Sequence, residues 1–194
     1  CGRVSLMPPI STNSKPSRIV NALFSLTQIK YGVKEIVFAT LITILILIFV
    51  VQPVRVEGTS MQPNLVDKER LFISKFVYHF GGVERGDVVV FWCPKNKTKR
   101  FIKRIVGLPG ERIEIRQGIV YVNHEPLNER YALLEDSEYY YHPPTQVPSK
   151  SYFVMGDQRS SSNDSRHWGS VPISLIFGKA VFRYWPVSKM GLLH

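Results

Sequence analysis

The sequence has few of the residues and motifs that build metal sites, disulfide scaffolds or the common hydrolase motifs. Its 194 residues include two cysteines, which cannot make a disulfide framework and form no C-x-x-C pair. None of the five histidines lies in an H-E-x-x-H motif, and there is no G-x-S-x-G nucleophile elbow. Gly and Pro number 13 each and 44% of residues are hydrophobic, which excludes disordered and low-complexity classes. We therefore expect a folded protein that uses no metal and no cofactor.

Charge is absent from residues 36–54, a run of 19 residues that is apolar on all sides. As a helix the run would be roughly 28 Å long, about one hydrocarbon thickness. A buried core helix would instead carry an amphipathic stripe. A cleaved signal peptide would have a short charged region before the run and an A-x-A-like site after it. We therefore predict an uncleaved transmembrane helix over residues 36–54.

Basic residues dominate the segment before this run. Residues 1–35 hold five basic residues and one acidic residue, a net charge of +4. The positive-inside rule predicts that this segment is cytoplasmic and that residues 55–194 form an extracytoplasmic domain (periplasmic, extracellular or lumenal). The net charge of +10 favours an anionic partner. On this topology the partner is the lipid bilayer of the cell membrane and not nucleic acid. The basic residues 95–100 fit a solvated hairpin turn, with anionic headgroups as the alternative partner.

The remaining 140 residues have the pattern of a β domain. Apolar or alternating runs at residues 88–92, 101–106, 152–155 and 178–185 predict strands. Residues 112–116 and 119–122 flank Gln117-Gly118, which predicts a hairpin. Residues 123–150 are rich in turn-forming residues and are expected to form a long excursion. We predict a mostly β fold: an antiparallel β catalytic domain with a barrel-like or sandwich core, tethered by one N-terminal transmembrane helix.

A serine activated by a lysine is the chemistry that the sequence best supports. A serine hydroxyl needs a base, and a lysine can serve when burial lowers its pKa. Period-2 alternation places Lys103 on one strand face with Phe101 and Ile105. Arg104 falls on the opposite face, where we expect it to be too far from the site or too solvated to matter as much. The alternative is that Lys103 lies at a barrel rim or edge strand, where its charge blunts pairing.

The partner serine is Ser60, which follows the predicted helix closely. A serine beside Gly and Pro is often only a turn residue. Its position five residues after Arg55 keeps Ser60 near the membrane surface. Met61 and Leu65 are expected to be exposed there and to contact lipid.

Four ordered blocks of the chain resemble type I signal peptidases, the Ser-Lys dyad leader peptidase family. The first resembles the nucleophile box, the second a structural strand box, the third the lysine box and the fourth the last box of the family. In order, the blocks are Gly58–Pro63, Arg85–Phe91, Lys103–Glu111 and Gly156–Arg166. The resemblance covers roughly residues 35–190.

The resemblance implies a role for each matching residue. Ser60 would be the nucleophile, with its backbone N–H in the oxyanion hole, and Lys103 the general base. Ser162 would hydrogen-bond the lysine, and Asp164 and Arg166 would form a supporting ion pair. Two positions depart from the common pattern. Gly58 supplies no side-chain hydroxyl for the oxyanion hole, and Gln158 replaces an asparagine.

The implied function is that of a membrane-anchored serine endopeptidase. It would remove N-terminal signal peptides from exported preproteins through an acyl-enzyme on the serine. The preproteins and the lipid bilayer would be its partners. A membrane-anchored β domain that binds lipid or protein without catalysis is one alternative. The other is an autoproteolytic Ser-Lys repressor, which would need a DNA-binding helical domain in place of the apolar run.

Overall fold

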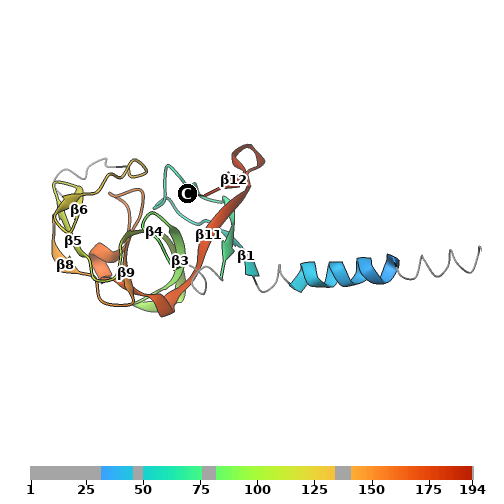
Figure 1. Cartoon of the computed structure of the whole chain (residues 1–194). Coiled ribbons are helices and arrows are strands. Elements are labelled where there is room, and N and C mark those ends of the chain that lie inside the picture. The colour runs from blue at the N-terminus through green and yellow to red at the C-terminus, as the bar shows by residue number, and fades with distance from the viewer. Residues whose placement is uncertain (1–31, 46–49, 76–81, 134–140, 194) are drawn as a thin grey trace, which may run out of the picture. The chain divides into compact units, whose positions relative to one another are not determined.

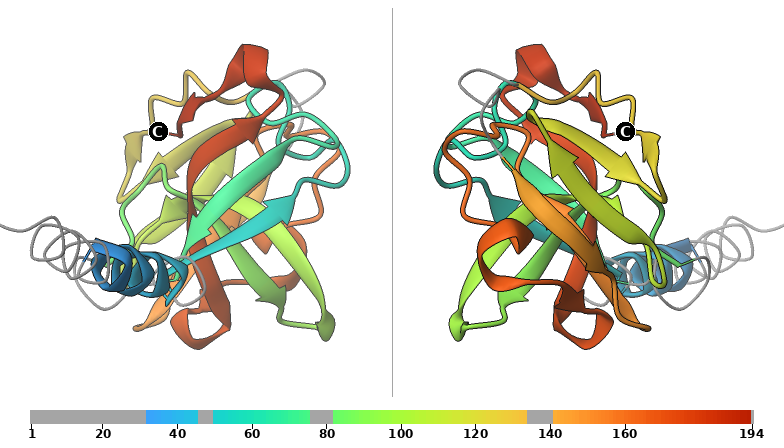
Figure 2. Two further views of the ribbon diagram at one scale, coloured as in Figure 1. Left: turned by 90° about the vertical axis from the view of Figure 1, so that its right-hand side faces the viewer. Right: turned by 90° about the vertical axis from the view of Figure 1, so that its left-hand side faces the viewer.

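The computed structural model describes residues 32–45, 50–75, 82–133 and 141–193, which belong to two compact units. The first unit, residues 1–45, is described only as a helix over residues 32–45. The second unit, residues 46–194, contains the β-strands and is drawn from three sides in Figures 1 and 2.

The described residues of the second unit form two antiparallel sheets. The larger sheet has the order β1 (Val51–Arg55), β2 (Arg70–Ser74), β11 (Ile176–Trp185), β3 (Val88–Cys93), β4 (Asn96–Gly107), β9 (Ser151–Met155) and β10 (Val171–Pro172), with β12 (Gly191–Leu192) beside β11. The smaller sheet has the order β7 (Glu125–Pro126), β6 (Ile119–Val122), β5 (Arg112–Arg116) and β8 (His142–Gln146). Three short helices are α3 (Ser165–Trp168), η1 (Ile173–Leu175) and η2 (Val187–Lys189). The mostly β, antiparallel prediction is confirmed.

Strands β3 and β4 form the centre of the larger sheet, and alternation along them divides the apolar core. Val88 and Val90 of β3 pack in one cluster, whereas Val89 and Phe91 pack in another. Both faces of β3 are therefore covered, which explains why its sequence is a continuous apolar run. A third cluster fills the space between β9 and the β5–β6 hairpin.

The predicted hairpin of residues 112–122 is present as β5 and β6. Its register pairs Arg116 with Ile119 across the two-residue turn. Gln117 and Gly118 both have positive φ, 50° and 76°, as a type I′ turn requires. The prediction is confirmed because the turn residues and the alternation on either side both favour the same register.

The predicted span of residues 36–54 is wrong at its C-terminal end. Val51–Arg55 is strand β1, which pairs antiparallel with β2. The backbone N–H and C=O groups of this stretch are satisfied by pairing with β2. Its apolar residues can therefore pack in the sheet. In the part of the chain that the structure describes, no helix has both the length and the apolar character of a membrane span. Residues 1–31 of the predicted cytoplasmic segment lie outside the described residues.

Two further segments differ from expectation. The excursion of residues 123–150 contains strands β7 and β8, and its residues 134–140 lie outside the description. The basic segment of residues 95–100 is a turn only at its start, because β4 begins at Asn96. Its remaining basic residues are exposed on that strand.

Candidate active site

Ser60 and Lys103 meet although 43 residues separate them in the sequence. Lys103 lies in β4, and Ser60 lies in the loop that follows β1. The Lys103 Nζ donates a hydrogen bond to Ser60 Oγ at 2.5 Å. In the neutral amine the roles reverse, and the serine hydroxyl donates to the nitrogen lone pair. The contact is therefore the one through which a lysine could take the proton of a serine.

Lys103 is buried, with 4% of its surface exposed, and shares its strand face with Phe101 as alternation predicted. Burial lowers the pKa of Lys103 from 10.5 to about 8. The negative charges of Asp164 and Asp157 oppose the shift, and the charge of Arg166 adds to it. Desolvation prevails because it penalises only the ammonium form. The alternative of a solvated lysine at a sheet rim is excluded by this burial.

The loop that carries Ser60 is held by backbone hydrogen bonds. Gln62 N donates to Thr59 O at 3.0 Å, and Leu65 N donates to Met61 O at 2.8 Å. From the last box, Gln158 N donates to Ser60 O at 3.1 Å. The serine is thus fixed on both sides of its own peptide group.

Met61 and Leu65 anchor this loop from beneath, and each is 1% exposed in the first core cluster. The prediction that Met61 contacts the membrane is wrong, as is the exposure expected for Leu65. The single turn after Ser60 directs both side chains inward, where they pack beside Val56 and Leu71. Their apolar character reflects the core that supports the nucleophile loop.

Ser162 lies next to the pair but does not bond the lysine. Its hydroxyl is buried and has no hydrogen-bond partner of normal geometry among the described residues. Ser162 can lie this close to the nucleophile loop because residue 156 is a glycine. A Cβ at Gly156 would overlap the Ser162 hydroxyl and the Ser60 carbonyl. The hydrogen bond expected between Ser162 and Lys103 is absent among the described contacts, and the amine bonds Ser60.

Asp164 and Arg166 form the predicted ion pair. Arg166 Nε donates to Asp164 Oδ1 at 2.8 Å, and the two side chains are 3% and 0% exposed. Burial by itself raises the pKa of Asp164, but the hydrogen bond and charge of Arg166 outweigh it. The nearby Ser162 hydroxyl and the Gly156 N–H also favour the charged form, and the pKa of Asp164 lies below its ordinary value. Asp164 also caps α3 by accepting from Arg166 N.

The backbone N–H of Ser60 is a candidate donor for an oxyanion. No acceptor within the described residues takes the Ser60 N–H. The Gly58 N–H, by contrast, already donates to Asp67 Oδ1 at 3.0 Å. Gly58 adopts a φ of +93°, which favours glycine and lets the chain turn into the loop. The oxyanion-hole role of the Ser60 N–H stays a prediction.

Arg104 is buried and paired, contrary to the expectation that it is solvated. It is 4% exposed and donates from Nε and Nη2 to Asp157 at 2.9 and 2.8 Å. Asp157 is completely buried. Sequence reasoning missed this pair, although Asp157 follows the first glycine of the last box. The pair could not be found from alternation, because the covering of both faces of β4 is seen only in the structure.

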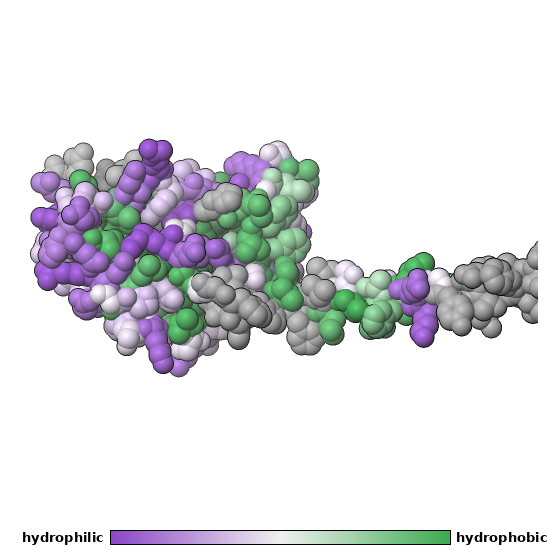
Figure 3. Space-filling model, viewed as in Figure 1, coloured by the Kyte–Doolittle hydropathy of each residue, from purple (hydrophilic) through white to green (hydrophobic). Residues whose placement is uncertain are grey.

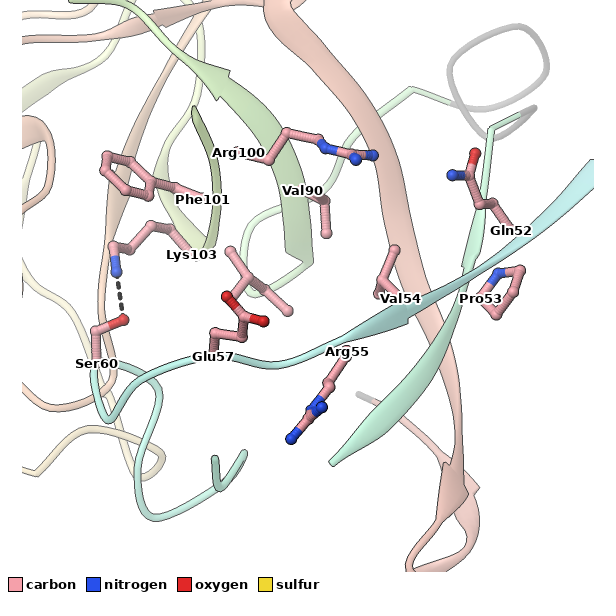
Figure 4. A pocket seen from close by; sticks show the side chains of 11 residues that line it. Gln52, Pro53, Val54, Arg55, Glu57, Ser60, Val90, Arg100, Phe101 and Lys103 are labelled. Carbon is pink, nitrogen blue, oxygen red and sulfur yellow. Dashed lines mark hydrogen bonds between the residues drawn. The ribbon is translucent and has the colours of Figure 1, made fainter. Parts of the chain in front are cut away.

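A groove of about 460 Å³ opens beside Ser60 and Lys103 (Figure 4). The stretch from β1 to Ser60 forms one wall and β4 forms the other, as the close view makes plain. The lining side chains belong to Gln52, Pro53, Val54, Arg55, Glu57, Ser60, Val90, Arg100, Phe101, Ile102 and Lys103. Sequence reasoning identified only Ser60 and Lys103 among them, because the groove arises from strands that are distant in sequence.

Comparison with known proteins places this site in a family. Residues 29–185 match the family model described as "Signal peptidase, peptidase S26". The chain is 41% identical to "Probable signal peptidase I-2" of Synechocystis over 165 residues, covering 82% of this chain and 75% of that protein. It is 38% identical to "Signal peptidase I" of Leptolyngbya laminosa over 170 residues, covering 84% and 82%. A solved signal peptidase I from Enterococcus faecalis is 32% identical, with a TM-score of 0.43 over 50% of this chain and 95% of that one.

The chain belongs to the signal peptidase family, peptidase S26. It is an enzyme of the signal peptidase I type, a serine endopeptidase and hydrolase.

Proposed function

We propose that this enzyme removes N-terminal signal peptides from exported preproteins with a Ser60–Lys103 dyad while anchored in a membrane. The observation that carries the proposal is the hydrogen bond between the Ser60 hydroxyl and a buried lysine whose pKa is lowered to about 8. A nucleophile beside a base of this kind can carry out acyl transfer at neutral to alkaline pH. The names of the relatives support the choice of substrate.

The mechanism has two halves. Neutral Lys103 accepts the Ser60 proton while Ser60 Oγ bonds to the carbonyl carbon at the cleavage site. The C–N bond then breaks, the amine of the mature protein takes the proton from Lys103, and an ester remains on Ser60. Lys103 next accepts a proton from water, whose oxygen attacks the ester, and Ser60 recovers its proton as the signal peptide leaves. The Ser60 N–H would donate to the carbonyl oxygen in both tetrahedral intermediates.

The groove fits an extended peptide. In the described residues, β1 pairs only with β2, and the segment from Arg100 to Lys103 pairs only with β3. Each wall therefore presents a strand edge with backbone groups that a substrate strand could use. Val54 and Ile102, which belong to the apolar core, also line the groove and would accept small side chains.

Membrane anchoring is supported by the first unit. The helix of residues 32–45 exposes large apolar side chains, among them Ile36, Phe38 and Leu41 at 68%, 66% and 61%. Such a surface is unstable in water and stable in lipid. The net charge of +4 before it supports a cytoplasmic N-terminus and an extracytoplasmic catalytic unit.

The catalytic unit also has an apolar face suited to a bilayer surface. Pro53, Phe72, Phe182 and Leu192 are successive cross-strand partners on β1, β2, β11 and β12. Cross-strand partners project from the same side of a sheet. Hydrophobic residues gather at the end of the unit where Figure 1 labels β1, β11 and β12 (Figure 3). This face supports the proposal that the catalytic unit contacts lipid, a contact that the buried Met61 does not make.

Replacement of the nucleophile tests the dyad. Ser60→Ala should lower cleavage of a signal-peptide-bearing preprotein in detergent by at least about 10³-fold, because Ser60 is the hydroxyl that hydrogen-bonds Lys103. Ser161→Ala, a change at an exposed serine of the last box, is the matched control and should cleave normally. More than trace cleavage by purified Ser60→Ala would contradict the proposal.

Topology is tested separately. Protease added outside sealed, right-side-out vesicles should digest the catalytic unit, since it is proposed to lie across the membrane from residues 1–35. Full protection of that unit would overturn the orientation without affecting the dyad.

A further inference from the structure

We propose that Asn64 is a positioning residue, which ties the loop of the nucleophile to the strand of the base through the buried carboxylate of Asp157. The inference rests on the proposed Ser60–Lys103 chemistry and deepens it. Asn64 is four residues after Ser60, and Arg104 directly follows Lys103. Asp157 receives hydrogen bonds from both sides, and so joins the two halves of the dyad.

The contacts at Asp157 are short and specific. Asn64 Nδ2 donates to Asp157 Oδ2 at 2.8 Å, and Arg104 occupies both carboxylate oxygens. The same Asn64 amide donates to the Tyr131 carbonyl at 2.7 Å. Both donor hydrogens of the amide are therefore used, which fixes the plane of the side chain.

The acceptors of Asn64 are themselves held in place. Tyr131 OH donates to Glu129 Oε1 at 2.9 Å, and Arg159 forms a buried ion pair with Glu129. Arg159 Nε also donates to the Gly156 carbonyl at 3.1 Å. Asn64 consequently binds a rigid cluster, and the bond from Gln158 N to Ser60 O reaches the nucleophile from the same segment.

Loss of the Asn64 hydrogen bonds, with the Arg104–Asp157 pair left intact, should misplace Ser60 relative to Lys103. Asn64→Leu keeps the branched shape of the side chain, with methyl groups in place of the amide oxygen and nitrogen, and removes both donor hydrogens. A displacement of about 1 Å can lower turnover by up to roughly 10²-fold. We expect kcat to fall at least tenfold with little change in KM, because the groove walls are not altered.

The pH dependence distinguishes positioning from general destabilisation. The charged groups that act on Lys103 are Asp164, Asp157 and Arg166, and the Asp157 charge favours the ammonium form. Without the Asn64 amide this charge is less neutralised, so the activity midpoint should move to higher pH. Asn64→Asp places a second carboxyl group beside the buried Asp157, and the two should share one proton because both cannot ionise at hydrogen-bond distance. That proton replaces the donor of the amide, so the midpoint of the Asp variant should lie nearer to wild type than the midpoint of the Leu variant.

The experiment measures kcat, KM and the activity midpoint of the full chain in detergent for wild type, Asn64→Leu, Asn64→Ser and Asn64→Asp. The Asn64→Ser variant retains one donor, so its kcat and activity midpoint should lie between those of wild type and Asn64→Leu. This variant covers the case that Asn64→Asp fails to fold. Asn96→Leu is the matched control and should behave as wild type, because the exposed Asn96 side chain accepts hydrogen bonds only from Thr98 among the described residues. An NMR titration of the Lys103 side chain follows the same midpoints without using activity.

A Leu variant with wild-type kcat, or unchanged Lys103 titration across the series, would overturn the proposal. If the Lys103 titration midpoint shifts across the Asn64 variants as expected but Ser60→Ala still cleaves, the result overturns the dyad and leaves the role of Asn64 standing.

Discussion

Two neighbouring residues of β4 respond to burial in opposite ways. Lys103 and Arg104 are each 4% exposed, and each brings a basic group into an interior where an unpaired charge is unstable. Arg104 donates two hydrogen bonds to Asp157 and a third, at 2.6 Å, to the Gly86 carbonyl. The hydrogen bond of Lys103 goes to the neutral hydroxyl of Ser60.

The difference shows how one strand can hold a structural cation and a base side by side. The bidentate carboxylate compensates for the lost hydration of Arg104, so that residue stabilises the sheet only as a charged group. The hydroxyl beside Lys103 compensates much less, and the carboxylates of Asp157 and Asp164 act on the amine only through space. Lys103 therefore gives up its proton more easily than an ordinary lysine.

Exchange of the two basic side-chain types should have the largest effect. Lys103→Arg should be as inactive as Ser60→Ala, a loss of at least about 10³-fold, because a guanidinium keeps its proton and cannot act as a base. Arg104→Lys keeps the charge but loses the bidentate geometry, and should lower turnover only about tenfold. Turnover of both purified variants from pH 6 to 10 checks the contrast. Substantial activity of Lys103→Arg would mean that the residue is a charge partner.

Replacement of each residue by methionine should change stability in opposite directions. Lys103→Met removes a desolvated amine and should stabilise the fold at pH 7 by on the order of 3 kcal/mol, given the pKa of about 8. Arg104→Met leaves Asp157 without its cation and should destabilise the fold by about 3–5 kcal/mol. Urea unfolding monitored by circular dichroism measures both changes.

The sign of the lysine effect sets its pH window. Because the folded-state pKa is lowered, the penalty of Lys103 is fully present below about pH 8 and disappears above pH 10.5. The advantage of Lys103→Met should therefore fade across that interval. A stability difference that is constant from pH 7 to 10.5 would show that the amine is not responsible.

The contrast between the two residues was only half predictable from the sequence. Alternation in residues 101–106 correctly placed Lys103 beside Phe101, because side-chain direction in a strand depends only on parity. The surroundings of Arg104 depend on Asp157, which is 53 residues away and to which the resemblance assigns no role. Parity gives a face, but only the core clusters on the two sides of the sheet show that both faces are covered.

The corrections at β1 and Met61 have the same physical origin. A run of apolar residues is stable in lipid, in a sheet or in a core, and hydropathy alone does not separate these environments. Val51–Arg55 pairs with β2, and Met61 packs below the nucleophile loop. Both assignments needed the position of β2, whose short sequence carries little signal of its own.

The activity of the enzyme should follow the titration of Lys103. Only the neutral amine can accept the Ser60 proton, so kcat/KM should rise with pH along a limb centred near pH 8. Roughly a tenth of the lysine is neutral at pH 7 and about nine tenths at pH 9, which predicts a rise of about ninefold. A limb centred near pH 10 would show that burial does not lower the pKa of the catalytic amine.

Substitution of Cys93 should have the smallest effect on turnover. It serves as an uncharged reference for the comparison of Lys103 with Arg104. Its thiol is free and buried at the end of β3, and Cys93 pairs with Asn96 across the hairpin turn. That point is seven residues along β4 from Lys103, roughly 23 Å of strand. Cys93→Ser should keep turnover within about twofold while lowering stability by about 1–2 kcal/mol, because a hydroxyl is harder to bury than a thiol. Turnover and urea unfolding of the same preparation check both parts. A severe loss of turnover in a folded variant would mean that the β3–β4 hairpin transmits changes at its turn to the base, and that the contrast between Lys103 and Arg104 is not set locally.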